Sequence, residues 1–324
     1  NNQSKIYGDP DPAFTFTYAG FQGTDTAAVL TTEPTCQVAV AHNGVGPFPI
    51  TCAGGVDENY VFSYTPGTLT INPRALVVTP DNKTKVYGDT FTAFTGVVTG
   101  LQARDNITVT YDSAGAPASA TVAGSPYPII ATLVDPDNRL PNYTVTLNTG
   151  TLTVTQRPLI VTPDNKTKIY GTAFTAFTGN ITGLQGGDSI TVTYASAGAP
   201  ATAPVGVYNI TATLGDPGLI LANYAVTLNI GTLTVTQRDL VVTPADKTKI
   251  YGDVFTAFTG AIVGIQNGDP ITATYASLGA PAPAAIGDYD ITVTLNAAPA
   301  VLANYNITLN IGTLTVTPRV LVVT

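Results

Sequence analysis

The sequence predicts an all-β protein built from four small immunoglobulin-like β-sandwich repeats in tandem. Three observations predict this class. Apolar, β-branched and aromatic residues alternate with polar ones at period two, and no segment shows the 3.6-residue period of a helix. In addition, three short motifs recur in one register along the whole chain, which is the signature of a repeat protein.

The recurring motifs divide the chain into four periods of about 80 residues. The motif Lys-(Ile/Val)-Tyr-Gly starts at Lys5, Lys85, Lys168 and Lys249; Asn-Tyr-x-x-(Thr/Ser) starts at Asn59, Asn142, Asn223 and Asn304; Gly-Thr-Leu-Thr starts at Gly67, Gly150, Gly231 and Gly312. The predicted repeats are 1–74, 75–157, 158–238 and 239–319, followed by an extra strand at 320–324.

The second repeat illustrates the expected elements in order. Strands are predicted at 75–79, 82–87, 94–99, 107–111, 127–133, 143–147 and 152–155. Val145 and Leu147 are expected to face the core, and Asn148 to Gly150 to form a short hairpin between the last two strands. The segments rich in Ala and Pro at 114–118, 197–203 and 280–285 are expected to be loops. The alternative fold is a β-grasp-like repeat, which would need a covering helix.

Composition excludes several classes of function. A net charge of −8 and 13 basic residues among 324 argue against nucleic acid. One His and two Cys leave no zinc ligand set, and no apolar run is long enough to insert in a membrane. No nucleophile or acid pair recurs, so we expect no enzyme and no cofactor. Asp9 to Asp11 and Asp135 to Asn138 offer clustered oxygens for calcium, although Asp-rich surface loops are the favoured interpretation.

The repeats are joined by very short links that contain Pro, such as 156–158, so we expect an extended, stiff rod. In the Lys-x-Tyr-Gly-Asp motif, we expect Tyr to end a strand, Gly to make the turn, and Asp9, Asp89 or Asp253 to cap it. The third repeat has Thr172 at the position of that Asp.

The two ends of the chain do not match. The first repeat lacks the apolar strand that opens the other three, and a matching strand follows the fourth repeat instead: Val320, Leu321, Val322, Val323 and Thr324. Two interpretations compete. Either the sequence is a window cut from a longer array, or the C-terminal strand of one molecule completes the first repeat of the next. The second interpretation predicts head-to-tail polymerisation with copies of itself.

Two kinds of covalent modification are predicted. Cys36 and Cys52 occur only in the first repeat, and an exported chain would join them in a disulfide. The Asn-x-(Ser/Thr) pattern marks candidate N-glycosylation sites at Asn2, Asn82, Asn106, Asn142, Asn165, Asn180, Asn209 and Asn306.

The combined motifs carry a resemblance to a known family. Lys-x-Tyr-Gly-Asp, then Gly-Leu-x-x-x-Asp (Gly100 to Asp105, and Gly183 to Asp188), then Asn-Tyr with Gly-Thr-Leu-Thr resemble the tandem MBG domains, Tyr-Gly-x type, of large bacterial secreted adhesins and surface proteins. The resemblance implies an extracellular, cell-surface repeat stalk with binding placed elsewhere in the parent protein. We therefore expect a structural filament or adhesin stalk. The alternative is an adhesive module that binds a glycan or a host surface protein through its loops.

Overall fold

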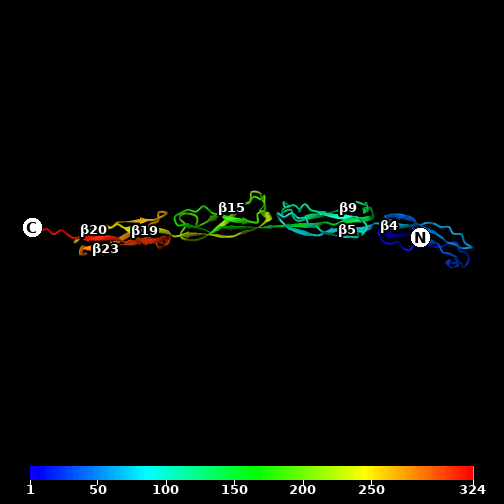
Figure 1. Ribbon diagram of the computed structural model, residues 1–324, viewed down its shortest axis with the longest axis horizontal. Helices are drawn as coiled ribbons and strands as arrows, with labels where there is room; N and C mark the ends of the chain where they lie inside the picture. Colours follow the sequence, from blue (N-terminus) through cyan, green and yellow to red (C-terminus); the bar gives the residue numbers. More distant parts are fainter. Residues whose placement is uncertain (324) are drawn as a thin grey trace. The chain divides into compact units, whose positions relative to one another are not determined.

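The computed structural model describes residues 1–323, and almost all of their regular structure is β-strand. The chain divides into two compact units, residues 1–157 and residues 158 onward. Figure 1 labels several of the strands, and each unit is described here by itself.

The second repeat consists of two sheets. One has three strands in the order β10-β5-β7, and the other has four strands in the order β6-β11-β9-β8. Their bounds are β5 (Arg74–Pro80), β6 (Lys83–Val86), β7 (Gly96–Thr99), β8 (Thr108–Asp112), β9 (Tyr127–Val134), β10 (Tyr143–Leu147) and β11 (Gly150–Thr155). All seven strands expected from the sequence are confirmed.

The third and fourth repeats have the same topology. The third contains β12 (Arg157–Pro163), β13 (Lys166–Ile169), β14 (Gly179–Thr182), β15 (Thr191–Ser196), β16 (Gly206–Gly215), β17 (Tyr224–Leu228) and β18 (Gly231–Thr236). The fourth contains β19 (Arg238–Pro244), β20 (Lys247–Ile250), β21 (Gly260–Val263), β22 (Thr272–Ser277), β23 (Gly287–Asn296), β24 (Tyr305–Leu309) and β25 (Gly312–Thr317).

Helices play almost no part in the described chain. Three 3₁₀ turns lie at η1 (Ala27–Val29), η2 (Leu140–Asn142) and η3 (Leu221–Asn223), and within residues 1–323 the only α-helix is α1 (Pro299–Leu302). A β-grasp needs a helix across its sheet, and a single turn cannot serve as one. None of the helices among the described residues is long and apolar enough to cross a membrane.

The core of the second repeat lies between its two sheets, as the facing positions of β5 and β9 show (Figure 1). In the second repeat, alternate residues of β5, β9 and β11 are buried: Leu76, Val78, Ile129, Ala131, Leu152 and Val154. Alternation follows from the pleat, which sends successive side chains to opposite faces of a sheet. A β-sandwich repeat is therefore the observed fold.

One expectation for the end of the repeat is wrong, and a second needs a correction of its extent. Strands β10 and β11 do not form a hairpin, because β10 pairs in parallel with β5 while β11 joins β6 and β9 in the other sheet. Gly150 is needed for close approach, since a Cβ there would lie 2.9 Å from the Pro80 carbonyl oxygen. Val145 and Leu147 lie opposite the buried Leu76 and Val78 on the core side of their sheet, but they are 39% and 47% exposed because β10 is an edge strand.

The first repeat has only the four-stranded sheet among its described strands, in the order β1-β4-β3-β2. The bounds are β1 (Gln3–Ile6), β2 (Thr35–Gln37), β3 (Gly46–Ala53) and β4 (Gly67–Asn72). Cys36 and Cys52 lie opposite each other on β2 and β3 and form a disulfide. The predicted disulfide is thus present, and it links neighbouring strands of a single sheet.

Candidate functional site: the junction between repeats

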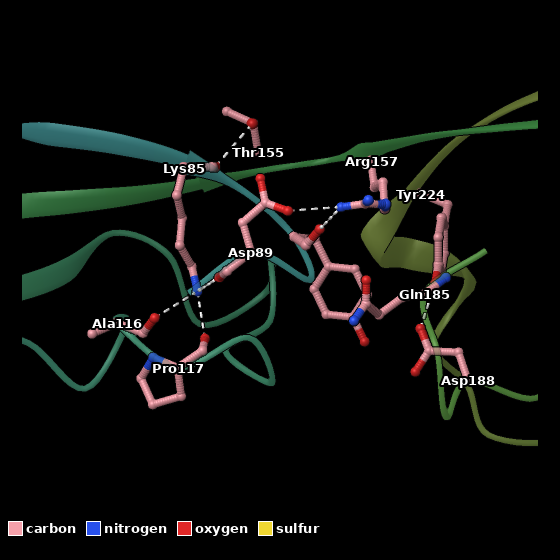
Figure 2. Close-up of polar contacts among 10 residues, drawn as sticks. Lys85, Asp89, Ala116, Pro117, Thr155, Arg157, Gln185, Asp188 and Tyr224 are labelled. Atoms are coloured by element: carbon pink, nitrogen blue, oxygen red, sulfur yellow. Dashed lines mark hydrogen bonds and ion pairs between the residues drawn. The ribbon is translucent and has the colours of Figure 1, made fainter. Parts of the chain in front are cut away.

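In the second, third and fourth repeats, the lysine of the Lys-x-Tyr-Gly motif is buried and surrounded by backbone carbonyls. In Figure 2, Lys85 Nζ donates to the carbonyl oxygens of Asp89 at 2.9 Å, Ala116 at 3.3 Å and Pro117. Three acceptors match the three N–H donors of an ammonium group. Burial lowers the pKa of Lys85. The lysine therefore joins the Tyr-Gly turn to the Ala-Pro loop, and Lys168 and Lys249 do the same in their repeats.

An arginine at the start of the following repeat holds the same turn from the other side. Arg157 Nη1 donates to the Tyr87 carbonyl and to the Asp89 carboxylate, both at 3.0 Å (Figure 2). Asp89 is therefore an ion-pair partner and not the turn cap that the sequence suggested. Equivalent contacts to the Tyr carbonyl are made by Arg74, Arg238 and Arg319.

In the third repeat, the position of this Asp is taken by Thr172. Its hydroxyl donates to the Ile169 carbonyl at 2.6 Å, and Arg238 Nη1 donates to the Tyr170 carbonyl at 3.2 Å. The sequence signal for this contact is the arginine that recurs at the links, at Arg74, Arg157, Arg238 and Arg319, a pattern separate from the three motifs.

The side chain of the motif tyrosine contacts residues of the next repeat. In the first unit, the Tyr7 hydroxyl donates to Asp105 Oδ1 at 3.1 Å, and Tyr143 donates to the second oxygen of the same carboxylate. The rings of Tyr7 and Tyr143 meet edge to face at 5.5 Å. Tyr7 comes from the Tyr-Gly motif, Asp105 from Gly-Leu-x-x-x-Asp and Tyr143 from Asn-Tyr. All three motifs thus meet at one junction between the first and second repeats.

A second polar contact crosses this junction. The Asn142 side-chain oxygen accepts a hydrogen bond from the backbone N–H of Val45 at 2.9 Å. Asn142 is buried, and an unpaired buried amide is costly, so this contact favours one relative placement of the two repeats.

The second unit repeats the arrangement between its own two repeats. The hydroxyls of Tyr170 and Tyr305 both donate to Asp269 Oδ2, at 2.9 and 2.6 Å. Asn304 accepts from the backbone N–H of Val205 at 2.9 Å. The same arrangement of two tyrosines on one aspartate is thus present in both units, which indicates that it is a general contact between neighbouring repeats.

Within the third repeat, Figure 2 also shows Tyr224, whose hydroxyl donates to Asp188. The same pair, Tyr60 to Asp25 at 2.7 Å, is present in the first repeat.

The junction environment favours the protonated form of Tyr143 and Tyr305. Burial, together with the hydrogen bond to Asp105, raises the pKa of Tyr143 to about 12. Burial and the hydrogen bond to Asp269 raise the pKa of Tyr305 to about 12 as well. A phenolate beside a carboxylate in a buried site would be doubly unfavourable, so the phenol remains a donor at neutral pH.

The first repeat carries a groove where the other repeats have their opening strand. In the second repeat β5 lies between β7 and β10, and the equivalent segments of the first repeat, 16–19 and 60–64, are not in a sheet. They line a groove of about 790 Å³ with an aromatic wall: Phe16, Tyr18, Phe21, Tyr60, Phe62 and Tyr64.

The disulfide occupies less space beside this groove than the residues at the equivalent positions of the second repeat. Cys36 pairs with Cys52 at the position where Tyr111 pairs with Ala131 in the second repeat. A Cβ at Gly96 would lie 2.6 Å from the Tyr111 hydroxyl, and Phe16 stands at the Gly96 position in the first repeat. The small cystine therefore leaves room for the large Phe16.

The remaining predicted residues are distributed over the chain. Asn142 is buried in the junction, so a glycan there would require the junction to open. The other seven candidate glycosylation sites are exposed. Val320, Leu321, Val322 and Val323 are exposed and in no sheet, and Thr324 lies outside the described residues.

The aspartate clusters proposed for calcium are occupied by donors of the protein. Asp11 accepts from Lys5 at 2.7 Å, and Asp135 from the backbone N–H groups of Arg139 and Leu140. Residues 1–323 contain no group of three or more His, Cys, Asp or Glu placed to hold a metal ion.

Comparison with known proteins agrees with the motifs that build the junction. The family model of the MBG domain (YGX type) matches four segments, 1–70, 76–153, 159–234 and 240–315. The chain belongs to the MBG domain family. Its four MBG domains each contribute the Tyr, Asp and Asn-Tyr positions described above. No curated protein matches the chain.

Solved structures similar to these MBG domains are tandem β-sandwich proteins. Drosophila N-cadherin EC1-4 covers 98% of this chain and 98% of its own at 9% identity, with a TM-score of 0.28. Sidekick-1 immunoglobulin domains 1–5 cover 87% of this chain and 68% of their own at 14% identity, with a TM-score of 0.25. The titin I9–I11 tandem covers 75% of this chain and 100% of its own at 11% identity, with a TM-score of 0.23.

Proposed function

We propose that the chain is an extracellular structural protein that forms a filament or adhesin stalk by donating its C-terminal strand to the first MBG domain of the next copy. The observation that supports this most directly is the correspondence between a groove and an exposed apolar segment. A groove in the first repeat occupies the place of β5, and an exposed apolar segment at 320–323 has the sequence pattern of β5.

The internal repeats define the register that a donated strand would take. β5 pairs in parallel with β10, with Leu76 opposite Val145 and Val78 opposite Leu147. Carried over by repeat position, Leu321 would lie opposite Phe62 and Val323 opposite Tyr64. Leu76 and Val78 are fully buried in their own repeat, whereas Leu321 is 88% exposed. Strand donation would therefore bury the side chains that are now in water.

Exposed backbone gives a second reason. An unpaired strand edge is a template for pairing with another chain, and the added strand gains main-chain hydrogen bonds on both sides. The partner surface is different from the donated strand, so the contact does not close on itself and generates a linear polymer. The disulfide between β2 and β3 is consistent with an oxidising, extracellular setting.

Register-specific cross-linking tests the proposal. Val77 pairs with Thr146 in the second repeat, so Val322→Cys and Ser63→Cys would face each other in a donated strand. Paired strands are about 4.8 Å apart, which a disulfide can span. We expect a ladder of disulfide-linked multimers on a non-reducing gel.

The matched control moves one cysteine by two residues. With Val322→Cys and Val61→Cys, the two Cα atoms would be about 8 Å apart and could not be bridged. Equal ladders from both pairs would contradict the register. A cross-linked monomer would show that the strand folds back on its own chain, which would contradict polymerisation. Saturable binding of a glycan or host protein by a chain that stays monomeric would favour the adhesive module.

A further inference from the structure

The junction within each unit consists of a donor group from one repeat and an acceptor group from the next. The fourth repeat also presents a donor group at an exposed position, and the first repeat presents an exposed acceptor group. The donor group is the tyrosine of the Tyr-Gly turn, and the acceptor group is the Asp with its neighbouring Asn-Tyr. Tyr7 and Tyr170, which act as donors, are 2% and 4% exposed, whereas the equivalent Tyr251 of the fourth repeat is 45% exposed.

The acceptor group in the first repeat is already assembled. Tyr60 donates to Asp25 Oδ2 at 2.7 Å and accepts from the Gln22 backbone N–H at 3.2 Å. The second repeat has the same arrangement, in which Gln102 N–H donates to Tyr143 at 3.0 Å and Tyr143 to Asp105. The difference is that Asp105 is buried and accepts Tyr7 on its other oxygen, whereas Asp25 is exposed.

The donor group in the fourth repeat is also formed in advance. The backbone N–H of Tyr251 donates to the Thr317 carbonyl at 2.9 Å, and Arg319 Nε donates to the Tyr251 carbonyl at 2.7 Å. Gly252 has a positive φ of 92°, as Gly8 has at 86° in the first repeat. The turn that presents the phenol therefore needs no rearrangement before it meets a partner.

We propose that Tyr251 of one copy donates its hydroxyl hydrogen bond to Asp25 of the next copy, so that the contact between subunits reproduces the internal Tyr–Asp–Tyr junction. This inference rests on the proposed head-to-tail assembly and names the residues that would align it. The occupant of the exposed Asp25 site is thus a second copy of this chain, which carries the complementary group in a turn of the same geometry.

A second contact follows from the same repeat positions. Asn142 and Asn304 each accept a backbone N–H, from Val45 and Val205 respectively. The equivalent acceptor in the first repeat is Asn59, which is exposed, and the equivalent donor in the fourth repeat is Ile286, which is also exposed. In the junction between subunits, the backbone N–H of Ile286 would donate to the side-chain oxygen of Asn59, as Val45 donates to Asn142 and Val205 to Asn304 within the chain.

The test compares one substitution at two kinds of junction. Tyr251→Phe removes the hydroxyl at the chain end, and Tyr7→Phe makes the same change inside the first unit. Assembly is followed by sedimentation and light scattering as the concentration at which half of the full chain is polymerised. Hydrogen bonds to charged groups are typically strong enough that Tyr251→Phe should raise this concentration about ten-fold.

The control should separate assembly from folding. Tyr7→Phe should lower the melting temperature of the first unit and leave the half-assembly concentration close to that of the unmodified chain. Asp25→Asn should act like Tyr251→Phe, and the double variant should be little worse than either single variant, because both remove the same contact.

The outcomes distinguish this inference from strand donation. If removal of 320–324 abolishes assembly and Tyr251→Phe has no effect, the tyrosine contact is wrong and strand donation stands. If the chain without 320–324 still polymerises and Tyr251→Phe weakens that polymer, the junction stands and strand donation is wrong. A full chain that stays monomeric at every concentration overturns both.

Discussion

The buried lysines show how one residue can hold two segments that the sequence leaves apart. Lys85 is nearly inaccessible, yet its partners are backbone carbonyls and not acids. Three carbonyl dipoles compensate the ammonium group in a site where water is excluded. The Ala-Pro loop has no regular structure of its own, so its position depends on this contact.

Replacing this lysine should destabilise its repeat. We expect Lys85→Met to lower the free energy of unfolding by about 1–3 kcal/mol, because three carbonyls lose their donor while the aliphatic chain is retained. Chemical denaturation measures the change. Lys83→Met is the matched control on the same strand, since Lys83 makes only a 3.5 Å contact with Asp81 at the surface. Equal losses from the two variants would contradict the role of the carbonyls.

Ionisation of the junction tyrosines should weaken the units at high pH. The pKa of Tyr143 is raised from 10.0 to about 12 by burial and Asp105. A raised folded-state pKa gives stability that is fully present below pH 10 and is lost as the pH rises to 12. Two pKa units correspond to about 3 kcal/mol at most.

Ultraviolet absorbance of tyrosinate, followed with the free energy of unfolding, checks this expectation. In Tyr143→Phe, the loss of stability between pH 10 and 12 should be smaller. An unchanged pH profile in that variant would assign the loss to other groups whose pKa is raised by burial, such as Tyr111.

At the scale of the element, strand position in the sheet decides which apolar residues matter. Strand β10 has the alternation of a core strand, but it lies at the edge of its sheet, and only Tyr143 is buried along it. Strand β11 has a similar sequence and is central between β6 and β9, with Leu152 and Val154 buried. The two strands therefore have similar sequence patterns but contribute differently to the free energy of unfolding.

A pair of substitutions should separate the two strands. We expect Leu152→Ala to cost about 2–5 kcal/mol in the free energy of unfolding, because it opens a cavity in a close-packed core. Leu147→Ala, the same change on β10, should cost far less, since that side chain is half exposed. Thermal unfolding of both variants gives the comparison, and similar costs would mean that β10 packs more tightly than its exposure indicates.

At the scale of the whole molecule, the two units carry different ends of the proposed junction. The second unit includes the complete third repeat and the segment 320–323, whereas the groove lies in the first repeat. Each unit also has its own internal Tyr–Asp–Tyr junction. The second unit should therefore fold without the first.

A fragment of residues 157–324 should cap filaments. It carries the donor strand and Tyr251 but has no groove, so it can be added to a growing end and cannot be extended. We expect it to be folded and monomeric by circular dichroism and sedimentation. Added at less than one mole per mole of full chain, it should shorten the filaments. Its counterpart with 320–324 removed should not shorten them, and shortening by both fragments would contradict strand donation.

Reduction of the disulfide should affect one end of the molecule. The Cys36–Cys52 bridge closes a short loop, for which about 3 kcal/mol of stabilisation is expected. The double variant Cys36→Ser and Cys52→Ser should therefore lower the melting temperature of the first repeat and leave the second unit unchanged. Calorimetry of the full chain resolves this, and a uniform shift of all transitions would contradict it.

The sequence by itself determined the number of repeats, the strands within each and the cysteine pair, because these depend on local period and on motif spacing. It also indicated that residues 1–74 contain no counterpart of β5, whereas residues 320–324 have its pattern. The sequence could not assign the exposure of Val145 and Leu147 or the role of Gly150, because edge position and chain crossing depend on which strands pair.

Only the tertiary structure decided what the motifs do. Tyr7, Asp105 and Tyr143 are far apart in the chain and belong to two repeats, so no local pattern predicts that they share one carboxylate. The same holds for Lys85 and the loop carbonyls. The motifs recur because each repeat must meet its neighbour in the same way, and a junction of buried polar groups is stable only when every partner is in place.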